Sequence, residues 1–533
     1  MDTVTIGGPS ERNLSVRTWV WLIALVVLAT AINITKAFHV DDPFHMKVAQ
    51  WIATHPFHPM SGSINWSGSV QYFHEGNQPP LFFYGMAAWA WVFGWGEIAM
   101  HAYEALFTVL AIVMFHRLAL MVVPRGAWLL TGLLAAGPAF IVNQNVMLDV
   151  PLLALEVTFL HAVMCAIRER RERHVVFAGL LLGAACLMKY TALAYLPALV
   201  FAAWQVRGRA WWGCIILVLI LGCWSAWNVW EFGSMHLVAR SGAGLPIDDV
   251  PVRSLTWVLV TGAIAPWSIF TLLPGSRLRL LGVSVALVLY LVAMIAVFLA
   301  YSGMLEPIEP VLRFLFIGNG LVGILGVLQA LKKGPMAPRV KALLLLMLVP
   351  PVLLIITYAP WMATRHVLLT LPVLLLLGGN ALCHVTKPID VVLIASTALL
   401  GIGLGISDVR LAEFYRRTPG EIALMYPEHT RWYTGSMGWG WYAEAAGFKD
   451  AASEHRGFTA KDLVAVPWDF SVPDPMTGPE FMTDTVLVQP IGPWDRLATR
   501  HWLRFYSVRF PDLPWTVARG RPERVEIKVR KVP

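Results

Sequence analysis

The chain has 533 residues, of which 57% are hydrophobic and only 14% are charged. Soluble domains carry about 25% charged residues, so this composition excludes a soluble globular protein and indicates one that crosses a membrane several times. The formal net charge of +8 does not indicate a nucleic-acid-binding protein, because most Lys and Arg residues lie in short loops between apolar segments, where positive charge sets membrane topology.

The first apolar segment, residues 18–36, is predicted to be a retained transmembrane helix. Two arginines precede it. A removed signal peptide would be followed by a cleavage site of small residues, and this segment is not. The stretch HVDDPFHMK, residues 39–47, comes directly after this helix, where the chain leaves the bilayer. Its adjacent carboxylates, Asp41 and Asp42, indicate chemistry on a membrane-associated substrate.

The segment 79–96 decides the predicted topology. It begins with two prolines and carries several Trp and Tyr rings, which favours a helix in the headgroup region. If it does not cross the bilayer, 17 of the 24 Lys and Arg residues up to residue 407 lie on the inner side and 7 on the outer side. The positive-inside rule then predicts 13 spans, with the N-terminus in the cytoplasm and the tail outside. The predicted spans are 18–36, 102–122, 127–143, 150–167, 175–188, 192–205, 211–230, 255–272, 279–302, 314–331, 341–359, 365–383 and 389–406.

The composition changes after residue 407, where charges, prolines and short alternating runs such as DLVAVPW and ERVEIKVRKV are typical of strands. We therefore predict an all-α polytopic membrane domain, 1–407, whose first outer loop is 37–101, and a small α/β domain outside the membrane, 408–533. The predicted location is the plasma membrane, the inner membrane of a bacterium.

Carboxylates and cations that could act on a substrate gather on the predicted outer face. Arg binds phosphate with two parallel hydrogen bonds and Lys with a point charge. A nearby carboxylate can take a proton from an acceptor or hold a divalent metal. The candidate site residues are Asp41, Asp42, Lys47, Gln78, Asp149, Lys189, Arg240 and Arg365.

Structural interpretations of these residues stay open at the level of sequence. Asp149 precedes Val150 and Pro151 and is typical of a helix N-cap. Lys189 and Arg365 are also typical of side chains that reach toward lipid headgroups. The five cysteines form no CxxC pattern and the histidines at 54–59 are typical of a solvated loop, so no metal site is indicated. The confinement of the charged residues to one face favours function.

Several segments resemble motifs of a known family, in the same order. DDPFHMKVAQWI resembles the acidic first-loop segment of protein O-mannosyltransferases and of the bacterial enzymes that add aminoarabinose to lipid A. NQPPLFFYG resembles the HPPL-type turn that ends this loop, and MLDVPLLA the aspartate motif of the second loop. The family's basic turn is similar to GAACLMKYTALAYLPAL, and a later helix that contains Arg is similar to TRHVLLTLPVLLLLGG. An aromatic motif of the C-terminal domain in some members is similar to WYTGSMGWGWYAEAAG.

The resemblance implies a C-type glycosyltransferase fold and a sugar donor linked to polyprenyl phosphate. Carried over, Asp41 would be the catalytic base or orient the acceptor, and Asp149 would complete the catalytic site. Lys189 would meet the donor phosphate, with Arg365 a second candidate. The resemblance thus predicts Asp41 and Asp149 as catalytic residues, and the predicted substrate-binding residues are Asp42, Lys47, Gln78, Lys189, Arg240 and Arg365. Two positions depart from the family pattern, because Asp42 replaces the usual Glu and Gln78 stands where mannosyltransferases have His before the two prolines.

The predicted function is transfer of a hexosyl or pentosyl group from a polyprenyl-phosphate carrier to a lipid, glycan or protein acceptor at the outer face of the membrane. Direct displacement at the anomeric carbon predicts inversion of configuration. A transporter or flippase of a lipid-linked sugar is the main alternative, which polar residues deep in the spans would favour. A non-catalytic scaffold is the third.

Overall fold

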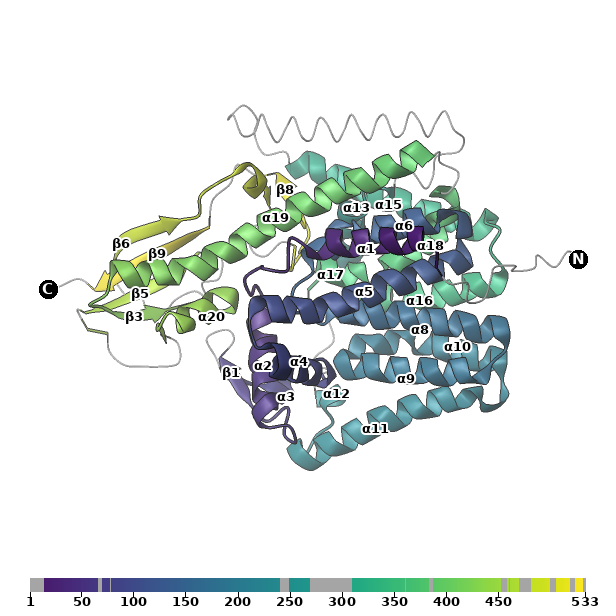
Figure 1. Ribbon diagram of the computed structural model, residues 1–533, viewed down its shortest axis with the longest axis horizontal. Coiled ribbons are helices and arrows are strands. Elements are labelled where there is room, and N and C mark those ends of the chain that lie inside the picture. The colour runs from purple at the N-terminus through teal and green to yellow at the C-terminus, as the bar shows by residue number, and fades with distance from the viewer. Residues whose placement is uncertain are drawn as a thin grey trace, which may run out of the picture.

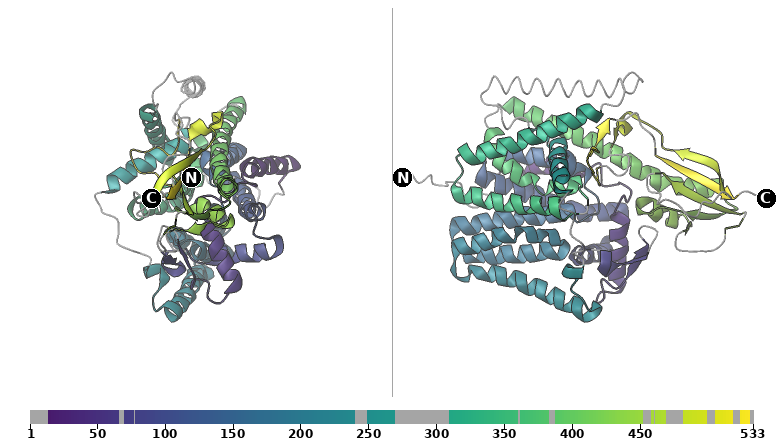
Figure 2. Two further views of the ribbon diagram at one scale, coloured as in Figure 1. Left: turned by 90° about the vertical axis from the view of Figure 1, so that its left-hand side faces the viewer. Right: turned by 180° about the vertical axis from the view of Figure 1, so that it is seen from behind.

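The computed structural model describes most of the chain, as a helical bundle with a strand-containing part at one end (Figures 1 and 2). The described residues are 14–65, 70–76, 78–239, 249–268, 309–359, 361–382, 387–451, 458–459, 461–468, 481–498, 505–517 and 523–530.

Six helices in the described ranges are long and apolar enough to cross a membrane, since a span needs about 20 residues. They confirm the prediction of a multi-pass membrane protein. They are α5 (Glu97–Val122), α8 (Asp149–Glu169), α11 (Trp212–Phe232) with the preceding η3 (Gly208–Trp211), α15 (Glu309–Lys333), α16 (Pro338–Thr357) and α19 (Lys387–Met425).

Other predicted spans correspond to shorter helices. The predicted span 127–143 is interrupted, because Gly137 and Pro138 end one helix and begin the next. The predicted span 279–302 lies outside the described residues. The number of thirteen spans therefore stays a prediction. The shorter elements are α1 (Val16–Thr30), η1 (Pro124–Gly126), α6 (Ala127–Ala135), α7 (Pro138–Val142), α9 (Glu172–Met188), η2 (Tyr190–Tyr195), α10 (Leu196–Val206), α12 (His236–Ala239), α13 (Val250–Ile264), α17 (Thr364–Leu368) and α18 (Leu371–Leu382).

The first loop forms its own small group of elements. Helix α2 runs across the direction of the long helices in Figure 1. Helix α4 has 13 residues, hence a length of about 20 Å, which is shorter than the hydrocarbon core of about 30 Å. This length is consistent with the interfacial helix predicted at 79–96. The elements are α2 (Asp42–Thr54), β1 (Ser63–Asn65), β2 (Val70–Tyr72), α3 (Phe73–Gly76) and α4 (Leu81–Phe93).

Glycines allow two helix pairs of the bundle to approach closely. A β-carbon on Gly179 of α9 would collide with the carbonyl oxygen of Gly213 in α11. In the same way, a β-carbon on Gly262 of α13 would collide with the backbone of α15 next to Gly320. Small residues at crossings are typical of membrane helices, where close van der Waals contact replaces the hydrophobic effect as the driving force.

The C-terminal part is a five-stranded mixed sheet in the order β4-β3-β5-β9-β6. Strand β3 is parallel to β4 and β5, whereas β9 is antiparallel to β5 and β6. Tyr415, Trp439, Leu463 and Ile527 belong to its core. The elements are β3 (Thr430–Tyr433), α20 (Met437–Ala445), β4 (Lys449–Asp450), β5 (Asp462–Pro467), β6 (Phe481–Val488), η6 (Pro493–Arg496), β7 (Leu497–Ala498), β8 (Thr516–Val517) and β9 (Arg524–Arg530).

Helix α19 joins the bundle to the sheet without interruption. It runs from the bundle along the sheet in Figure 1 and in the right-hand view of Figure 2. Its 39 residues pass through the predicted domain boundary at 407/408. The two predicted domains therefore share one helix, and their boundary stays a prediction.

Candidate functional site

Four of the side chains predicted from the sequence form one ion-pair chain. Arg365 is at its centre: its Nη2 donates to Oδ2 of Asp41 at 3.0 Å, and its Nε lies 3.5 Å from Oδ2 of Asp149. Lys189 completes the chain, because its Nζ donates to the other carboxylate oxygen of Asp149 at 2.7 Å. Two carboxylates and two cations therefore alternate, although Asp41 and Arg365 are 324 residues apart in sequence.

Helix ends position two of these side chains. Asp149 is the first residue of α8 and Lys189 follows the last residue of α9, so each charge lies where the helix dipole stabilises it. Asp149 is not the N-cap of its helix, and both of its oxygens face cations. Both cations pair with this carboxylate, a contact that neither the N-cap interpretation of Asp149 nor the headgroup interpretation of the cations predicts.

Access to solvent changes along the ion-pair chain. The Asp149, Arg365 and Lys189 side chains are 5%, 8% and 12% exposed, whereas that of Asp41 is 27% exposed. Burial strengthens the electrostatic interactions at the closed end, since water screens them less there. Asp41 is the accessible end, where a substrate group could meet a carboxylate.

The backbone next to Asp41 is strained. Val40 has a φ of +49°, in the left-handed region that β-branched residues avoid, and its side chain is buried. Such a conformation costs on the order of 1–3 kcal/mol and persists only where the surroundings impose it. The surroundings here include α20, because a β-carbon on Gly438 would collide with the carbonyl oxygen of Phe38.

Asp42 lies apart from the ion-pair chain. Its side chain is fully buried, and Oδ2 accepts a hydrogen bond from the backbone N–H of His39 at 2.8 Å. Burial raises the pKa of Asp42 to about 7, although this hydrogen bond acts in the opposite direction. In this structure Asp42 stabilises the turn that carries Asp41, and its predicted substrate-binding role stays a prediction.

Lys47, another predicted substrate-binding residue, forms an ion pair outside the ion-pair chain. Lys47 donates to both carboxylate oxygens of Glu444 in α20, at 2.8 and 3.0 Å. Gln78 is half-buried directly before Pro79 and Pro80. Arg240 lies outside the described residues.

A second group of charged and polar residues, which the sequence analysis did not select, lies near the same segments. The amine of Lys36 donates to Oδ2 of Asp408 and to Oδ1 of Asn145, each at 2.5 Å. The hydroxyl of Tyr506 donates to Oδ2 of Asp408 at 2.7 Å and accepts from Nδ2 of Asn145 at 2.9 Å. His39 Nε2 lies 3.5 Å from Oδ1 of Asp408. All five side chains are at most 3% exposed, and we call them the buried network.

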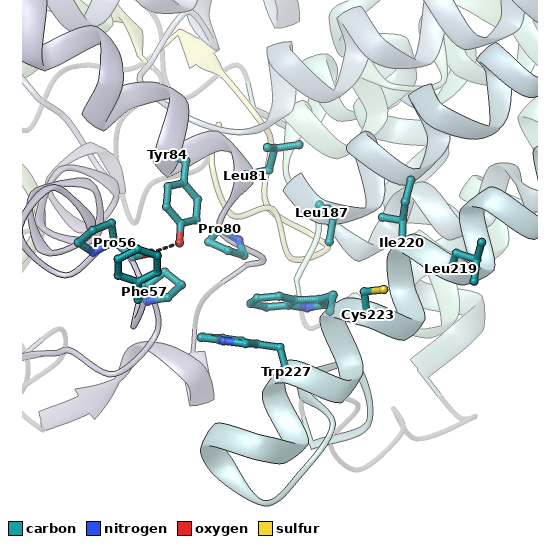
Figure 3. A pocket seen from close by; sticks show the side chains of 12 residues that line it. Pro56, Phe57, Pro80, Leu81, Tyr84, Leu187, Leu219, Ile220, Cys223 and Trp227 are labelled. Atoms are coloured by element: carbon teal, nitrogen blue, oxygen red, sulfur yellow. Dashed lines mark hydrogen bonds between the residues drawn. The ribbon is translucent and has the colours of Figure 1, made fainter.

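An apolar pocket of about 610 Å³ lies between the first loop and α11 (Figure 3). Phe57 and Tyr84 come from the first loop, whereas Cys223 and Trp227 come from α11. It extends to Leu187, two residues before Lys189. The pocket is lined by Pro56, Phe57, Pro59, Pro80, Leu81, Tyr84, Leu187, Leu219, Ile220, Cys223, Trp224 and Trp227.

Trp224 connects this pocket to the turn after Lys189. Its indole N–H donates to the hydroxyl of Tyr190 at 2.7 Å, and this hydroxyl also lies 2.9 Å from Nδ1 of His236. Within the described ranges, no three His, Cys, Asp or Glu side chains gather as metal ligands.

Fold and site together define a multi-pass membrane protein with a cluster of paired carboxylates and cations next to its helix ends. Residues 77–230 match the family model of dolichyl-phosphate-mannose-protein mannosyltransferases. This match confirms the resemblance to membrane glycosyltransferases for the part of the chain that carries Asp149 and Lys189. No curated protein sequence matches the chain.

Two solved structures are similar to this chain at low identity. ArnT from Cupriavidus metallidurans, bound to undecaprenyl phosphate, is 15% identical over 96% of this chain and 98% of that chain, with a TM-score of 0.41. The archaeal oligosaccharyltransferase AglB from Archaeoglobus fulgidus, in complex with an inhibitory peptide and a dolichol-phosphate, is 12% identical over 84% of this chain and 62% of that chain, with a TM-score of 0.45.

Proposed function

We propose that this protein is a membrane glycosyltransferase that moves a sugar from a polyprenyl-phosphate carrier to a lipid, glycan or protein acceptor. The ion-pair chain carries the proposal, because it joins two carboxylates to two cations at the ends of apolar helices. The family match over residues 77–230, which include Asp149 and Lys189, supports it.

The proposed mechanism assigns the two cations to the carrier phosphate. Negative charge grows on this phosphate as the glycosidic bond breaks, so Lys189 and Arg365 stabilise the transition state. Asp41 takes the proton of the acceptor, because it is the accessible carboxylate of the chain. Direct displacement by the acceptor inverts the configuration at the anomeric carbon.

The apolar pocket supports a lipid-linked donor. It extends to Leu187 near Lys189. Helix α11, which forms one of its walls, is mostly exposed and apolar, as expected of a helix that faces lipid. A phosphate held at Lys189 therefore has an apolar surface beside it for an isoprenoid chain.

The test is to incubate the purified protein with polyprenyl-phosphate hexoses and pentoses and to follow release of the carrier phosphate. We expect Asp41→Asn to lower turnover by roughly 10²–10⁴-fold, the usual contribution of a general base. Asp484→Asn is the matched control, because Asp484 lies exposed on β6, outside the ion-pair chain. Equal turnover of Asp41→Asn and wild type would remove Asp41 from the mechanism.

A transporter of a lipid-linked sugar is the second candidate. Glu104 of α5 and Glu156 of α8 are buried within helices that can span the membrane, where ionisable groups often mark a transport path. Absence of turnover with every donor, together with movement of a labelled lipid-linked sugar across vesicles, would favour this candidate.

The proposed orientation places the ion-pair chain outside the cytoplasm of the cell. It rests on the excess of Lys and Arg in the predicted inner loops. A reporter fused after residue 172 is expected to be cytoplasmic, and an external signal there would contradict the thirteen-span topology.

A further inference from the structure

We propose that Tyr506, in the C-terminal part of the chain, is a positioning residue that holds the catalytic segments in place through the buried network. The inference rests on the proposed function and goes beyond it, because Tyr506 belongs neither to the ion-pair chain nor to the pocket.

Three segments carry the ion-pair chain at its open and central parts. They are 36–42, which ends at Asp41 and Asp42, 143–149, which ends at Asp149, and 362–365, which ends at Arg365. None is regular helix or strand over its whole length, so their relative positions depend on contacts with other parts of the chain.

The hydroxyl of Tyr506 lies where two of these segments meet. It accepts from Asn145 of the second segment and donates to Asp408 of α19. Asp408 in turn binds Lys36 of the first segment. Lys36 also donates directly to Oδ1 of Asn145, so the hydroxyl adds a second connection between the segment of Asp41 and the segment of Asp149, by way of a carboxylate that is 1% exposed.

The backbone beside Tyr506 holds the third segment. The carbonyl oxygen of Phe505 accepts from the backbone N–H of Thr364 at 3.1 Å and from its hydroxyl at 2.9 Å. Thr364 directly precedes Arg365. The N–H of Val508 donates to the carbonyl oxygen of Met362 at 2.6 Å. Residues 505–508 thus contact all three segments, directly or through Asp408.

The first segment also needs such a hold because of its strained backbone. Val40 is in the left-handed region. Besides the contact of Lys36 with Asp408, the backbone N–H of Phe38 donates to the hydroxyl of Tyr442 in α20 at 2.8 Å. A segment held in an unfavourable conformation relaxes when its contacts are weakened, and Asp41 moves with it.

The experiment compares wild type with Tyr506→Phe, which keeps the ring beside His39 and removes only the hydroxyl. We expect kcat to fall about tenfold while KM for the donor stays within about twofold, because a small misplacement slows the reaction more than it weakens binding. Tyr415→Phe is the matched control. Tyr415 is fully buried in α19, the helix that also carries Asp408, but it packs in the core of the sheet.

A double variant separates positioning from general destabilisation. If Tyr506 acts by placing Asp149, Tyr506→Phe should change kcat much less in an Asp149→Asn background than in wild type, since coupled residues are not additive. Equal fold-changes in the two backgrounds would contradict this role.

Hydrogen exchange of the backbone amides tests the positioning role of Tyr506 without an activity assay. We expect Tyr506→Phe to speed exchange of the amides at 143–149 and 362–366, and Tyr415→Phe to leave them unchanged. If the wild type is active, a Tyr506→Phe variant with the same activity and the same protection from exchange would overturn the inference and leave the proposed function intact. If the wild type is inactive with every donor, the proposed function is overturned. In that case hydrogen exchange alone tests the inference, and unchanged protection in Tyr506→Phe would overturn it.

Discussion

The ion-pair chain and the buried network contain similar chemical groups but differ in their access to solvent. Asp41 of the ion-pair chain is 27% exposed, whereas every member of the buried network is at most 3% exposed. The accessible Asp41 can exchange its partner for a substrate group, which a fully buried carboxylate such as Asp408 cannot do. Pairing alone therefore does not identify a site. Asp149 and Arg365, at 5% and 8%, are nearly as buried as the buried network, so the ion-pair chain differs from it in having one end open to solvent.

The buried network should be the more sensitive of the two in stability. Lys36→Met leaves the Asp408 carboxylate buried without its cation, which costs about 3–5 kcal/mol. We expect a large fall in the thermal unfolding temperature in detergent, partly restored in Lys36→Met/Asp408→Leu, which removes both charges. Asp41→Asn, at the open end of the ion-pair chain, should change the unfolding temperature much less, and an equal fall would erase the distinction.

The ion-pair chain should be the more sensitive in activity. Lys189→Met removes the cation assigned to the donor phosphate, and a hydrogen bond between charged groups contributes about 1.5–3 kcal/mol. We therefore expect carrier release to slow roughly 10- to 100-fold. Lys341→Met is the control. Lys341 lies near the start of α16, outside the ion-pair chain, and donates to the carbonyl oxygen of Leu331 in α15. Similar losses in both variants would argue against a phosphate at Lys189.

The pH dependence of stability tests Asp42, which directly follows Asp41 in the sequence. In the folded protein the pKa of the Asp42 carboxyl group is about 7, whereas in the unfolded chain it is about 3.8. The folded state therefore binds more protons between these pH values, so its stability falls as pH rises, by up to about 1.4 kcal/mol per pH unit. Asp42→Asn should flatten this fall in melting curves recorded from pH 4 to 8. A slope identical to wild type would mean that Asp42 ionises normally.

The smallest expected effect on stability concerns Lys47 and Glu444, whose side chains are 33% and 43% exposed. Exposed ion pairs contribute less than about 1 kcal/mol, so Lys47→Ala and Glu444→Gln, which can still accept from the Tyr433 hydroxyl, should unfold almost as wild type does. Activity separates the two, because only Lys47 is predicted to contact substrate. Equal activities of the two variants would leave Lys47 a surface contact between α2 and α20.

Much of the ion-pair chain could be predicted from the sequence because its members follow local rules. Asp149 and Lys189 stand at the ends of apolar segments, where a charge is rare enough to be noticed, and charge counting placed them on one predicted face. Asp41 follows the first apolar segment and Arg365 is one of the seven cations on the predicted outer side, and the family resemblance then selected Asp41 over Asp42. What the sequence could not provide is the pairing itself, since the distances between these positions along the chain carry no signal.

The buried network could not be predicted, because its members are even farther apart along the chain and pairing at such distances leaves no signal in the sequence. Lys36 and Asp408 are 372 residues apart, and Tyr506 is another 98 residues beyond. Lys36 is one of the seven Lys and Arg residues on the predicted outer side, where positive charge is disfavoured, but nothing in its own segment indicates its partner. Asp408 coincides with the point where hydropathy falls, and only their meeting in space shows that the two residues belong together.

The fold shows a similar limit. Hydropathy correctly predicted a helical multi-pass protein, but it treats every apolar run as one span. It could not show that 127–143 breaks at Gly137 and Pro138, or that α19 continues past the point where the composition changes.

The length of α19 has a consequence of its own. A helix of 39 residues is about 58 Å long, nearly twice the thickness of the hydrocarbon core. About half of it therefore extends beyond the hydrocarbon core, where it packs against the sheet, and Asp408 lies partway along it. A displacement of the sheet would therefore reach Asp408 and the buried network through a single helix, in which Pro419 is the position where bending is expected.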